Sequence, residues 1–248
     1  MEEILSIAQH PPTRDTVNVK HGRKVYCQTM LMLAIRYSPA HVGAILDTEG
    51  LDINIQDMFG WTALHCAIHS NPPSAWQILQ RPDVDLTLTC TSGRTMLMMA
   101  CYDDQVHLGM ELLRRNVNPN LFSHDGGTAL MEACYWSPSL ALALIAYPGI
   151  KTDAALARAI CRDHPHVVLA LVRHPEVDLW AKTEGEYPLN RINTSYTRYA
   201  EEYRALLSSG MRRDVLWALM GPRHVPRLHQ GKWGKLPADL VKLAVFLL

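Results

Sequence analysis

The stretch that decides the fold reads Gly60-Trp61-Thr62-Ala63-Leu64-His65-Cys66-Ala67. From Thr62, a leucine follows after two positions and an alanine after five, and this pattern recurs along the chain. It opens at Thr29 with TMLMLA, at Thr95 with TMLMMA and at Thr128 with TALMEA, so the numbering advances by 33 from each threonine to the next. A fixed period in this range is typical of a solenoid built from stacked supersecondary units.

Two weaker copies follow the four strong ones. AALARA opens at Ala154, a step of only 26 in the numbering from Thr128, and YPLNRI opens at Tyr187, where the step is again 33. The shortened step falls around Pro148-Gly149, where the loop between two units is expected. Either the stack continues there with a shortened loop, or the chain forms two sub-arrays with a hinge. The spacing leaves both explanations open.

Each copy reads as a turn followed by two helices. A glycine stands two residues before Thr62, Thr95 and Thr128, and glycine permits the positive φ of a tight turn. The threonine is placed to cap the first helix, and the leucine and alanine share one helical face because they lie three residues apart. Apolar pairs predict a second helix in three copies: Ile78 and Leu79, Leu112 and Leu113, Leu144 and Ile145.

The period and the Thr-x-Leu-x-x-Ala core resemble the ankyrin repeat. One copy carries the histidine typical of that family, His65, whereas Met32, Met98 and Met131 replace it in the other strong copies. The resemblance implies an all-α ankyrin-repeat solenoid of about six helix-turn-helix repeats. We expect an N-terminal cap over 1–19, the repeat array over 20–208 and a helical C-terminal tail over 209–248.

The composition argues against several classes of function. Lys+Arg and Asp+Glu both number 24, so the formal net charge is zero and the basic excess typical of nucleic-acid binding is lacking. The six cysteines form no CxxC pair, which favours reduced thiols in the cytoplasm or nucleus. The acidic N-terminus and the absence of a run of roughly 18 apolar residues predict neither a signal peptide nor a membrane span.

Residues with catalytic potential are better explained as structural. Two histidines, His164 and His166, have no nearby third ligand for zinc and are expected in a solvated loop. The thiols of Cys66, Cys101 and Cys134 stand next to the packing alanines and are expected to fill space. No phosphate-binding loop, carboxylate pair or nucleophile elbow is found in the sequence. We therefore expect no enzyme activity, no cofactor and no metal.

The resemblance implies a concave binding surface formed by the loop tips and the exposed side of each first helix. The seventh and eighth positions after each threonine belong to it: Arg36, Tyr37, His69, Ser70, Tyr102, Asp103, Tyr135 and Trp136. The loop tips contribute Met58, Phe59, Trp61, Ser92, Arg94, His124 and Asp125. Aromatic residues and arginine are enriched at interface hot spots. The predicted partner-binding residues are therefore Phe59, Trp61, Arg94, Tyr102, Tyr135 and Trp136, with the rings in a nearly continuous strip. The alternative for any single ring is packing against a neighbouring repeat.

The C-terminal stretch LPADLVKLAVFLL, 236–248, predicts an apolar helix that must be covered. It resembles the opening helix of an F-box, the tails of poxviral ankyrin proteins and, more distantly, a SOCS box. The resemblance covers only this end of the chain, whereas a complete F-box has two further helices. It implies a cullin adaptor bound by Leu236, Pro237, Leu240, Leu243 and Leu247. The alternative is a helix that caps the last repeat.

These observations predict a non-catalytic protein-interaction module that binds a partner in the concave groove, with the tail linking it to a cullin-type ubiquitin ligase. Two alternatives remain: an ankyrin scaffold whose tail is only a cap, and a regulatory subunit of an enzyme.

Overall fold

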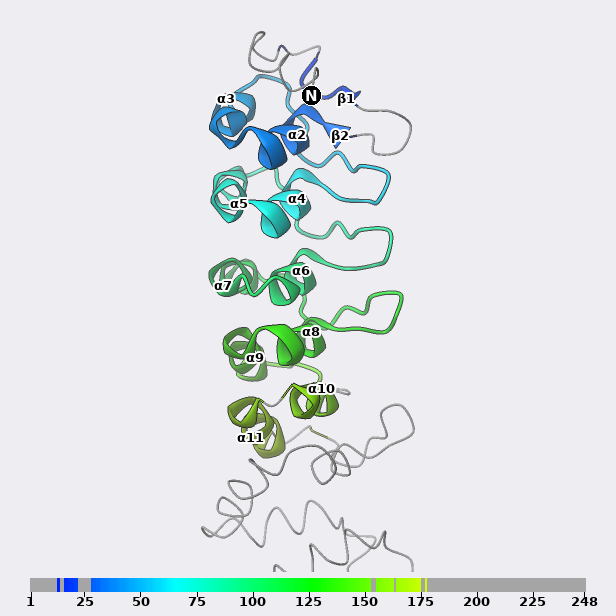
Figure 1. Ribbon diagram of the computed structural model, residues 1–248, viewed down its shortest axis with the longest axis vertical. Helices are drawn as coiled ribbons and strands as arrows, with labels where there is room; N and C mark the ends of the chain where they lie inside the picture. Colours follow the sequence, from blue (N-terminus) through cyan, green and yellow to red (C-terminus); the bar gives the residue numbers. More distant parts are fainter. Residues whose placement is uncertain are drawn as a thin grey trace, which may run out of the picture. The chain divides into compact units, whose positions relative to one another are not determined.

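The computed structural model describes residues 13, 16–21, 28–152, 155–162, 164–174 and 177. Over residues 28–150 it contains four stacked helix pairs, numbered here as repeats one to four (Figure 1). Repeat one consists of α2 (Met30–Tyr37), the short 3-10 helix η1 (Pro39–His41) and α3 (Val42–Leu46). The later pairs are α4 (Ala63–Ser70) with α5 (Pro72–Leu79), α6 (Met96–Tyr102) with α7 (Val106–Arg114), and α8 (Ala129–Trp136) with α9 (Pro138–Ile145).

In repeats one to four, the start of the first helix is set by the repeated threonine. The side-chain oxygens of Thr62, Thr95 and Thr128 accept hydrogen bonds from the backbone N–H three residues later, at 3.4, 3.1 and 3.3 Å. At Thr62 the cap is reciprocal, because Nδ1 of His65 accepts the Thr62 backbone N–H at 3.2 Å. The predicted capping role of the threonine is confirmed.

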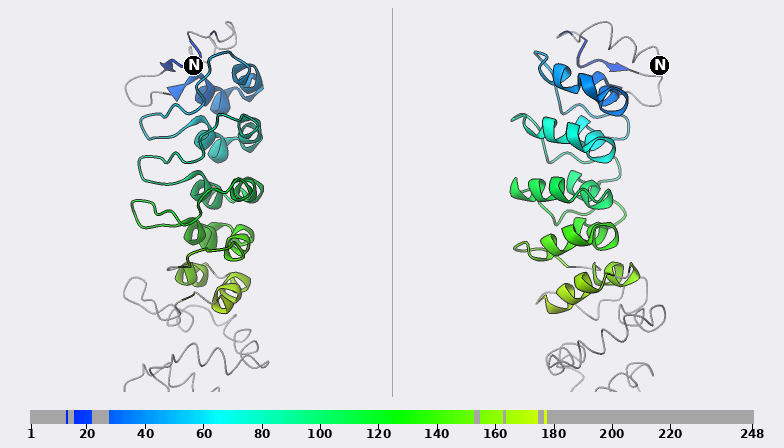
Figure 2. Two further views of the ribbon diagram at one scale, coloured as in Figure 1. Left: turned by 180° about the vertical axis from the view of Figure 1, so that it is seen from behind. Right: turned by 60° about the vertical axis from the view of Figure 1, so that its left-hand side comes forward.

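The helices form two columns. The first helices α2, α4, α6 and α8 pack on one another as the inner column, and α3, α5, α7 and α9 form the outer column (Figure 2). Ala67, Ala100 and Ala133 have no exposed surface, so small residues stand where the inner helices meet. In the outer column, a Cβ added to Gly109 would lie 2.5 Å from Cδ2 of Leu140, so α7 and α9 approach closely at this glycine.

A loop connects each outer helix to the next inner helix, and its extended part is called a finger. Finger two (51–61), finger three (84–94) and finger four (117–127) project from the same side of the helices (Figure 1). The Thr91 N–H donates to the Phe59 carbonyl at 2.8 Å, and the His124 N–H donates to the Ser92 carbonyl at 2.9 Å. Adjacent fingers are therefore joined backbone to backbone.

Asparagine side chains also join the loops of successive repeats, a feature that the sequence reasoning missed. Nδ2 of Asn54 donates to the Asp83 carbonyl, and its Oδ1 accepts the Asp85 N–H, both at 2.8 Å. Asn18 bridges to Gly50 and Asp52 in the same way. Each bridge uses both ends of one amide, which fixes the spacing between two loops.

The shortened step in the period coincides with a division of the chain into two compact units after Ile150. The connection from the end of α9 at Ile145 to the next helix at Ala155 is shorter than the connection from Leu79 to Met96. The second unit contains α10 (Ala155–Cys161) and α11 (Pro165–Arg173), which pack on each other. The shortened loop is thus confirmed, and the hinge stays a prediction.

Two details differ from the sequence predictions. A pair of two-residue antiparallel strands, β1 (Lys20–His21) and β2 (Gln28–Thr29), precedes α2 in the otherwise helical part that is described. His166 lies in the first turn of α11 and not in a loop, because Pro165 can begin a helix at this position. His164 immediately precedes that helix as its N-cap.

Other predictions fall beyond the described residues. These are the sixth repeat, the tail over 209–248 and the predicted adaptor-binding residues Leu236, Pro237, Leu240, Leu243 and Leu247. The domain boundaries stay predictions as well. Among the described helices, none has the length and apolar character needed to cross a membrane.

Candidate functional site

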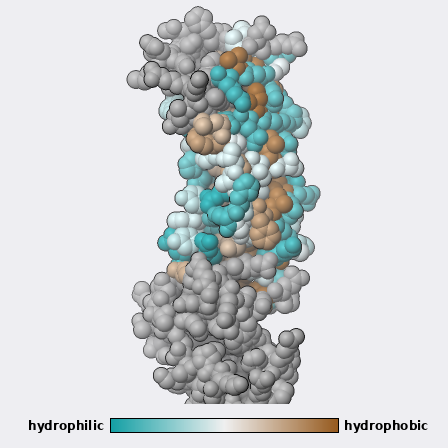
Figure 3. Space-filling view, turned by 90° about the vertical axis from the view of Figure 1, so that its right-hand side faces the viewer, coloured by the Kyte–Doolittle hydropathy of each residue, from teal (hydrophilic) through white to brown (hydrophobic). Residues whose placement is uncertain are grey.

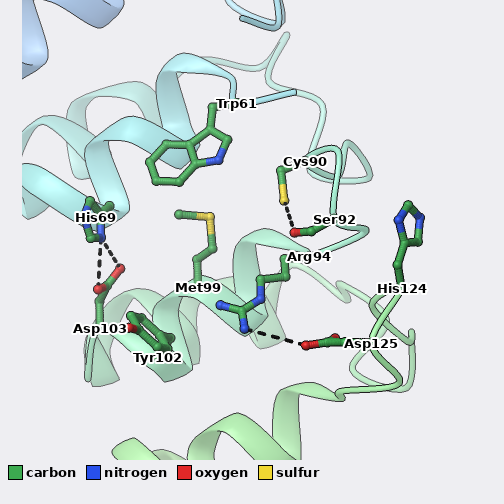
Figure 4. A pocket seen from close by; sticks show the side chains of 10 residues that line it. All are labelled: Trp61, His69, Cys90, Ser92, Arg94, Met99, Tyr102, Asp103, His124 and Asp125. Atoms are coloured by element: carbon green, nitrogen blue, oxygen red, sulfur yellow. Dashed lines mark hydrogen bonds and ion pairs between the residues drawn. The ribbon is translucent and has the colours of Figure 1, made fainter. Parts of the chain in front are cut away.

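A cavity of about 660 Å³ opens where fingers two, three and four meet the inner helices of repeats two and three (Figure 4). The side chains around it come from three successive fingers and two inner helices. They are Trp61, His69, Cys90, Ser92, Arg94, Met99, Tyr102, Asp103, His124 and Asp125. Ligand pockets commonly have volumes of about 300–1,000 Å³, so this cavity is large enough for a side chain or a small ligand.

The first cluster of contacts begins at Trp61. Its ring meets the His69 ring edge to face, with centroids 5.6 Å apart, and the Arg36 guanidinium lies 5.9 Å from the Trp61 ring centroid. Nδ1 of His69 is 3.1 Å from both carboxylate oxygens of Asp103, which belongs to the next repeat. Trp61 and the His69–Asp103 pair thus form one wall of the cavity.

The second cluster is centred on Tyr102. The Arg94 guanidinium lies 5.5 Å from its ring centroid, and the Trp136 ring meets it edge to face at 5.2 Å. Trp136 also packs edge to face against Tyr135, with centroids 4.6 Å apart. Tyr102 and Trp136 remain 43% and 41% exposed, so the contacts fix the rings without burying them.

Two spacings in the sequence account for both clusters. In repeats two and three, the residue before the capping threonine meets the residue eight positions later, in the pairs Trp61–His69 and Arg94–Tyr102. The second spacing joins neighbouring repeats. The residue seven positions after the capping threonine of one repeat meets the residue eight positions after the capping threonine of the next repeat, so their numbers differ by 34. The pairs His69–Asp103 and Tyr102–Trp136 both follow this rule.

The charges around the cavity are unevenly paired. Nη2 of Arg94 lies 3.4 Å from Oε1 of Glu132 and 4.0 Å from Oδ2 of Asp125. The Ser123 hydroxyl donates to the Asp125 carboxylate, and this hydrogen bond holds the pKa of that carboxyl below its usual value. Burial instead raises the pKa of Asp103, although His69 opposes the shift. Asp103 is therefore the less well stabilised carboxylate of the two.

Burial shifts the pKa values of the thiols and of one histidine in the surrounding helices. Burial raises the pKa of the Cys66 thiol to about 11 and raises those of Cys101 and Cys134 further, so these thiols stay protonated. Burial lowers the pKa of His65 to about 4, and its ring completes the helix cap. No group of three or more potential metal ligands occurs in the described part of the chain.

The structure places the predicted partner-binding residues in two groups. Trp61, Arg94 and Tyr102 line the cavity, and Tyr135 and Trp136 extend from it along α8. Phe59 lies at the turn of finger two and is not among the lining residues. Ring-to-ring contacts join Tyr102, Trp136 and Tyr135, whereas the Trp61 ring contacts His69. The nearly continuous strip stays a prediction. Sequence reasoning missed Met99 and Cys90, and it named His69 and Asp103 without their contact, which the offset of 34 reveals.

The finger side also exposes apolar side chains. Figure 3, which looks onto this side, shows hydrophobic patches separated by hydrophilic surface. The exposed large apolar residues of the fingers are Met58, Phe59, Leu121 and Phe122. They form a second, more scattered source of contact area beside the cavity.

Comparison with known families identifies part of the array. Residues 71–155 match the family described as ankyrin repeats, in three copies. This stretch includes the outer helix of repeat two, the whole of repeats three and four, and the start of α10. The predicted ankyrin repeats are confirmed over this range. A comparison with curated proteins finds none that matches the chain.

Proposed function

We propose that the chain is a non-catalytic protein-binding module that holds a partner protein against the cavity and the adjoining rings of α8. The observation that carries the proposal is the Tyr102–Trp136 contact, which keeps two large rings side by side and about two-fifths exposed. Ankyrin repeats, found over 71–155, generally bind protein partners. A repeat array with an exposed aromatic site and inert thiols suits binding better than catalysis.

The energetics of association support the same choice. Aromatic and arginine side chains supply most of the binding energy at many interfaces. Here the Arg94 guanidinium packs over the Tyr102 ring, and the Trp136 ring packs against Tyr135. These side chains therefore lose little conformational entropy on binding. A preorganised surface loses less entropy when a partner docks.

The test compares two variants with three substitutions each. The groove variant carries Trp61→Ala, Tyr102→Ala and Trp136→Ala. The matched control carries Trp76→Ala, Met110→Ala and Leu142→Ala, three exposed apolar residues on the outer helices α5, α7 and α9. Each full-length chain is used for affinity capture from cell lysate with quantitative mass spectrometry, and circular dichroism verifies folding.

We expect the groove variant to lose at least about 90% of the specifically captured partner, because removing two or three hot-spot side chains costs several kcal/mol. The control should retain it. Loss in the control with retention in the groove variant would place the partner on the outer helices and contradict the proposal.

A finer proposal concerns the tail. The sequence LPADLVKLAVFLL supports a role as the adaptor-binding helix of a cullin-type ubiquitin ligase, which would make the array a substrate receptor. The full chain and a chain ending at Lys235 are compared for capture of cullin and its adaptor. Recovery by the full chain alone, with the shorter chain folded, supports the ligase role. Absence of cullin from both captures would contradict the ligase role. The two alternatives, an ankyrin scaffold and a regulatory subunit of an enzyme, would then remain.

A further inference from the structure

We propose that the partner segment seated in the cavity is basic, with the cationic head of a lysine or arginine entering between Trp61 and Tyr102 and pairing with Asp103. This inference rests on the proposed function and adds the chemistry of the partner.

The first support is the charge of the array. Between residues 28 and 150 the chain contains five arginines, no lysine and 11 aspartates or glutamates, a formal charge of −6. The whole chain is neutral, so the array is far more acidic than the total suggests. A surface dominated by one sign of charge attracts partners of the opposite sign and speeds their association.

The second support is the local charge of the cavity. Asp103 and Asp125 line the cavity, and Glu132 and Asp125 both lie near the Arg94 guanidinium, the one guanidinium among the lining residues. With neutral histidines these groups sum to −2, and including Arg36 beside Trp61 leaves −1. An acidic partner segment would add a like charge to this group, whereas a basic one would neutralise it.

The third support is the unused hydrogen-bonding capacity of the Asp103 carboxylate. A carboxylate offers about four lone-pair sites. Both oxygens of Asp103 contact Nδ1 of His69, and no other described donor is bonded to them. The Asp103 side chain is 14% exposed and lines the cavity, so a donor that enters the cavity can reach its remaining lone pairs. A lysine ammonium or an arginine guanidinium would supply such a donor.

The walls of the cavity also suit a cation. Trp61 already carries the Arg36 guanidinium near its ring, and Tyr102 carries that of Arg94. These two contacts show that both rings lie in positions where guanidinium groups approach them. Cation–π attraction strengthens when the ring and the cation are partly removed from water. The thioether of Met99, which is 6% exposed, gives the alkyl stem of the incoming side chain an apolar surface.

The experiment uses a phage-displayed library of random dodecapeptides, selected on the folded full-length chain at low salt. Enriched peptides are synthesised, and their affinities are measured by fluorescence anisotropy. The test variant is Asp103→Asn, which keeps the shape and removes the charge. The matched control is Asp104→Asn, a neighbour that does not line the cavity and whose positive φ of 52° asparagine tolerates.

We expect the enriched peptides to be net positive and to contain lysine or arginine. Asp103→Asn should raise their Kd at least about tenfold, because truncating one partner of a largely buried charge pair is costly. Asp104→Asn should change it less than about twofold, and Asp103→Glu, which restores the charge, should bind more tightly than Asp103→Asn. Raising the salt concentration should weaken binding to the unmodified chain.

Three results would overturn the inference: enrichment of acidic or neutral peptides, equal effects of Asp103→Asn and Asp104→Asn, or no enrichment. Peptides that depend on the rings of the groove variant but not on Asp103 would refute the basic partner and leave the proposed function standing. Failure of the lysate capture to distinguish the groove variant from its control would refute the proposed function separately.

Discussion

Repeats two and four begin with the same local signals and differ in what surrounds them. Gly60 and Gly126 both adopt positive φ, at 73° and 78°, and both precede a capping threonine. A Cβ at Gly60 would lie 2.7 Å from the Thr91 backbone nitrogen in finger three. A Cβ at Gly126 would meet no described atom within 4 Å.

The caps of the two repeats also differ. In repeat two the cap is reciprocal, since His65 returns a hydrogen bond to Thr62. In repeat four Met131 takes the place of that histidine, and the Thr128 side chain alone provides the cap. The same backbone geometry is therefore reached with different side chains, and the stability of each copy depends on its neighbours as well as on its own sequence.

The largest effect is expected for alanine at the two glycines. Gly126→Ala should cost about 1–2 kcal/mol of the free energy of unfolding, because alanine disfavours positive φ. Gly60→Ala should cost about 4 kcal/mol, since the clash with the next finger adds to that strain. Urea denaturation of both variants gives the comparison. Equal losses would contradict the role assigned to the contact between fingers two and three.

A similar effect is expected on acidification. His65 has a pKa of about 4 in the folded chain, lowered by burial from 6.5, so the unfolded chain binds the proton first as the pH falls. The contribution of His65 to the free energy of unfolding is fully present above about pH 6.5. It falls by about 3 kcal/mol as the pH is lowered towards 4.

The variant His65→Met tests this expectation because repeat four already uses methionine at the same position. Urea denaturation at pH 7 and at pH 4 should show a smaller pH dependence for His65→Met than for the unmodified chain. If the two pH dependences were the same, His65 would not be the group responsible.

A smaller effect is expected for the asparagine bridge. Asn54→Ala removes two hydrogen bonds that join two loops and should cost about 1–2 kcal/mol. Thr87 occupies the matching position one period later and bonds to Asp85 within its own loop, so Thr87→Ala should cost less than about 0.5 kcal/mol. Thermal denaturation of both variants makes the comparison, and a larger loss for Thr87→Ala would show that the bridge contributes little.

The smallest effect on stability is expected at the rings of the candidate site. Trp136→Ala loses two edge-to-face contacts of a partly exposed side chain and should cost about 1 kcal/mol. Circular dichroism and thermal denaturation should therefore find a folded chain. A loss of several kcal/mol would mean that Trp136 is chiefly a structural residue, as the alternative interpretation of the sequence allows.

Much of the fold was predictable because its signals are local. Each capping threonine and turn glycine acts within a few residues of itself, and the buried leucine and alanine of each inner helix follow the helical period. The two-residue strands and the asparagine bridges were not predicted, because their partners lie on other loops. The partner-binding role of the predicted residues stays a prediction. Phe59, Tyr102 and Trp136 are exposed, whereas Trp61 and Tyr135 are half-buried against neighbouring rings, which the repeat register alone does not reveal.

The sequence by itself determined the repeat period, the caps, the turns and the residues buried in the inner helices. The tertiary structure alone decided which side chains meet across repeats. The pairs His69–Asp103 and Tyr102–Trp136 are joined by an offset of 34, one more than the period. The physical reason is that the period is encoded in local backbone preferences, whereas the offset depends on how one helix pair is displaced relative to the next.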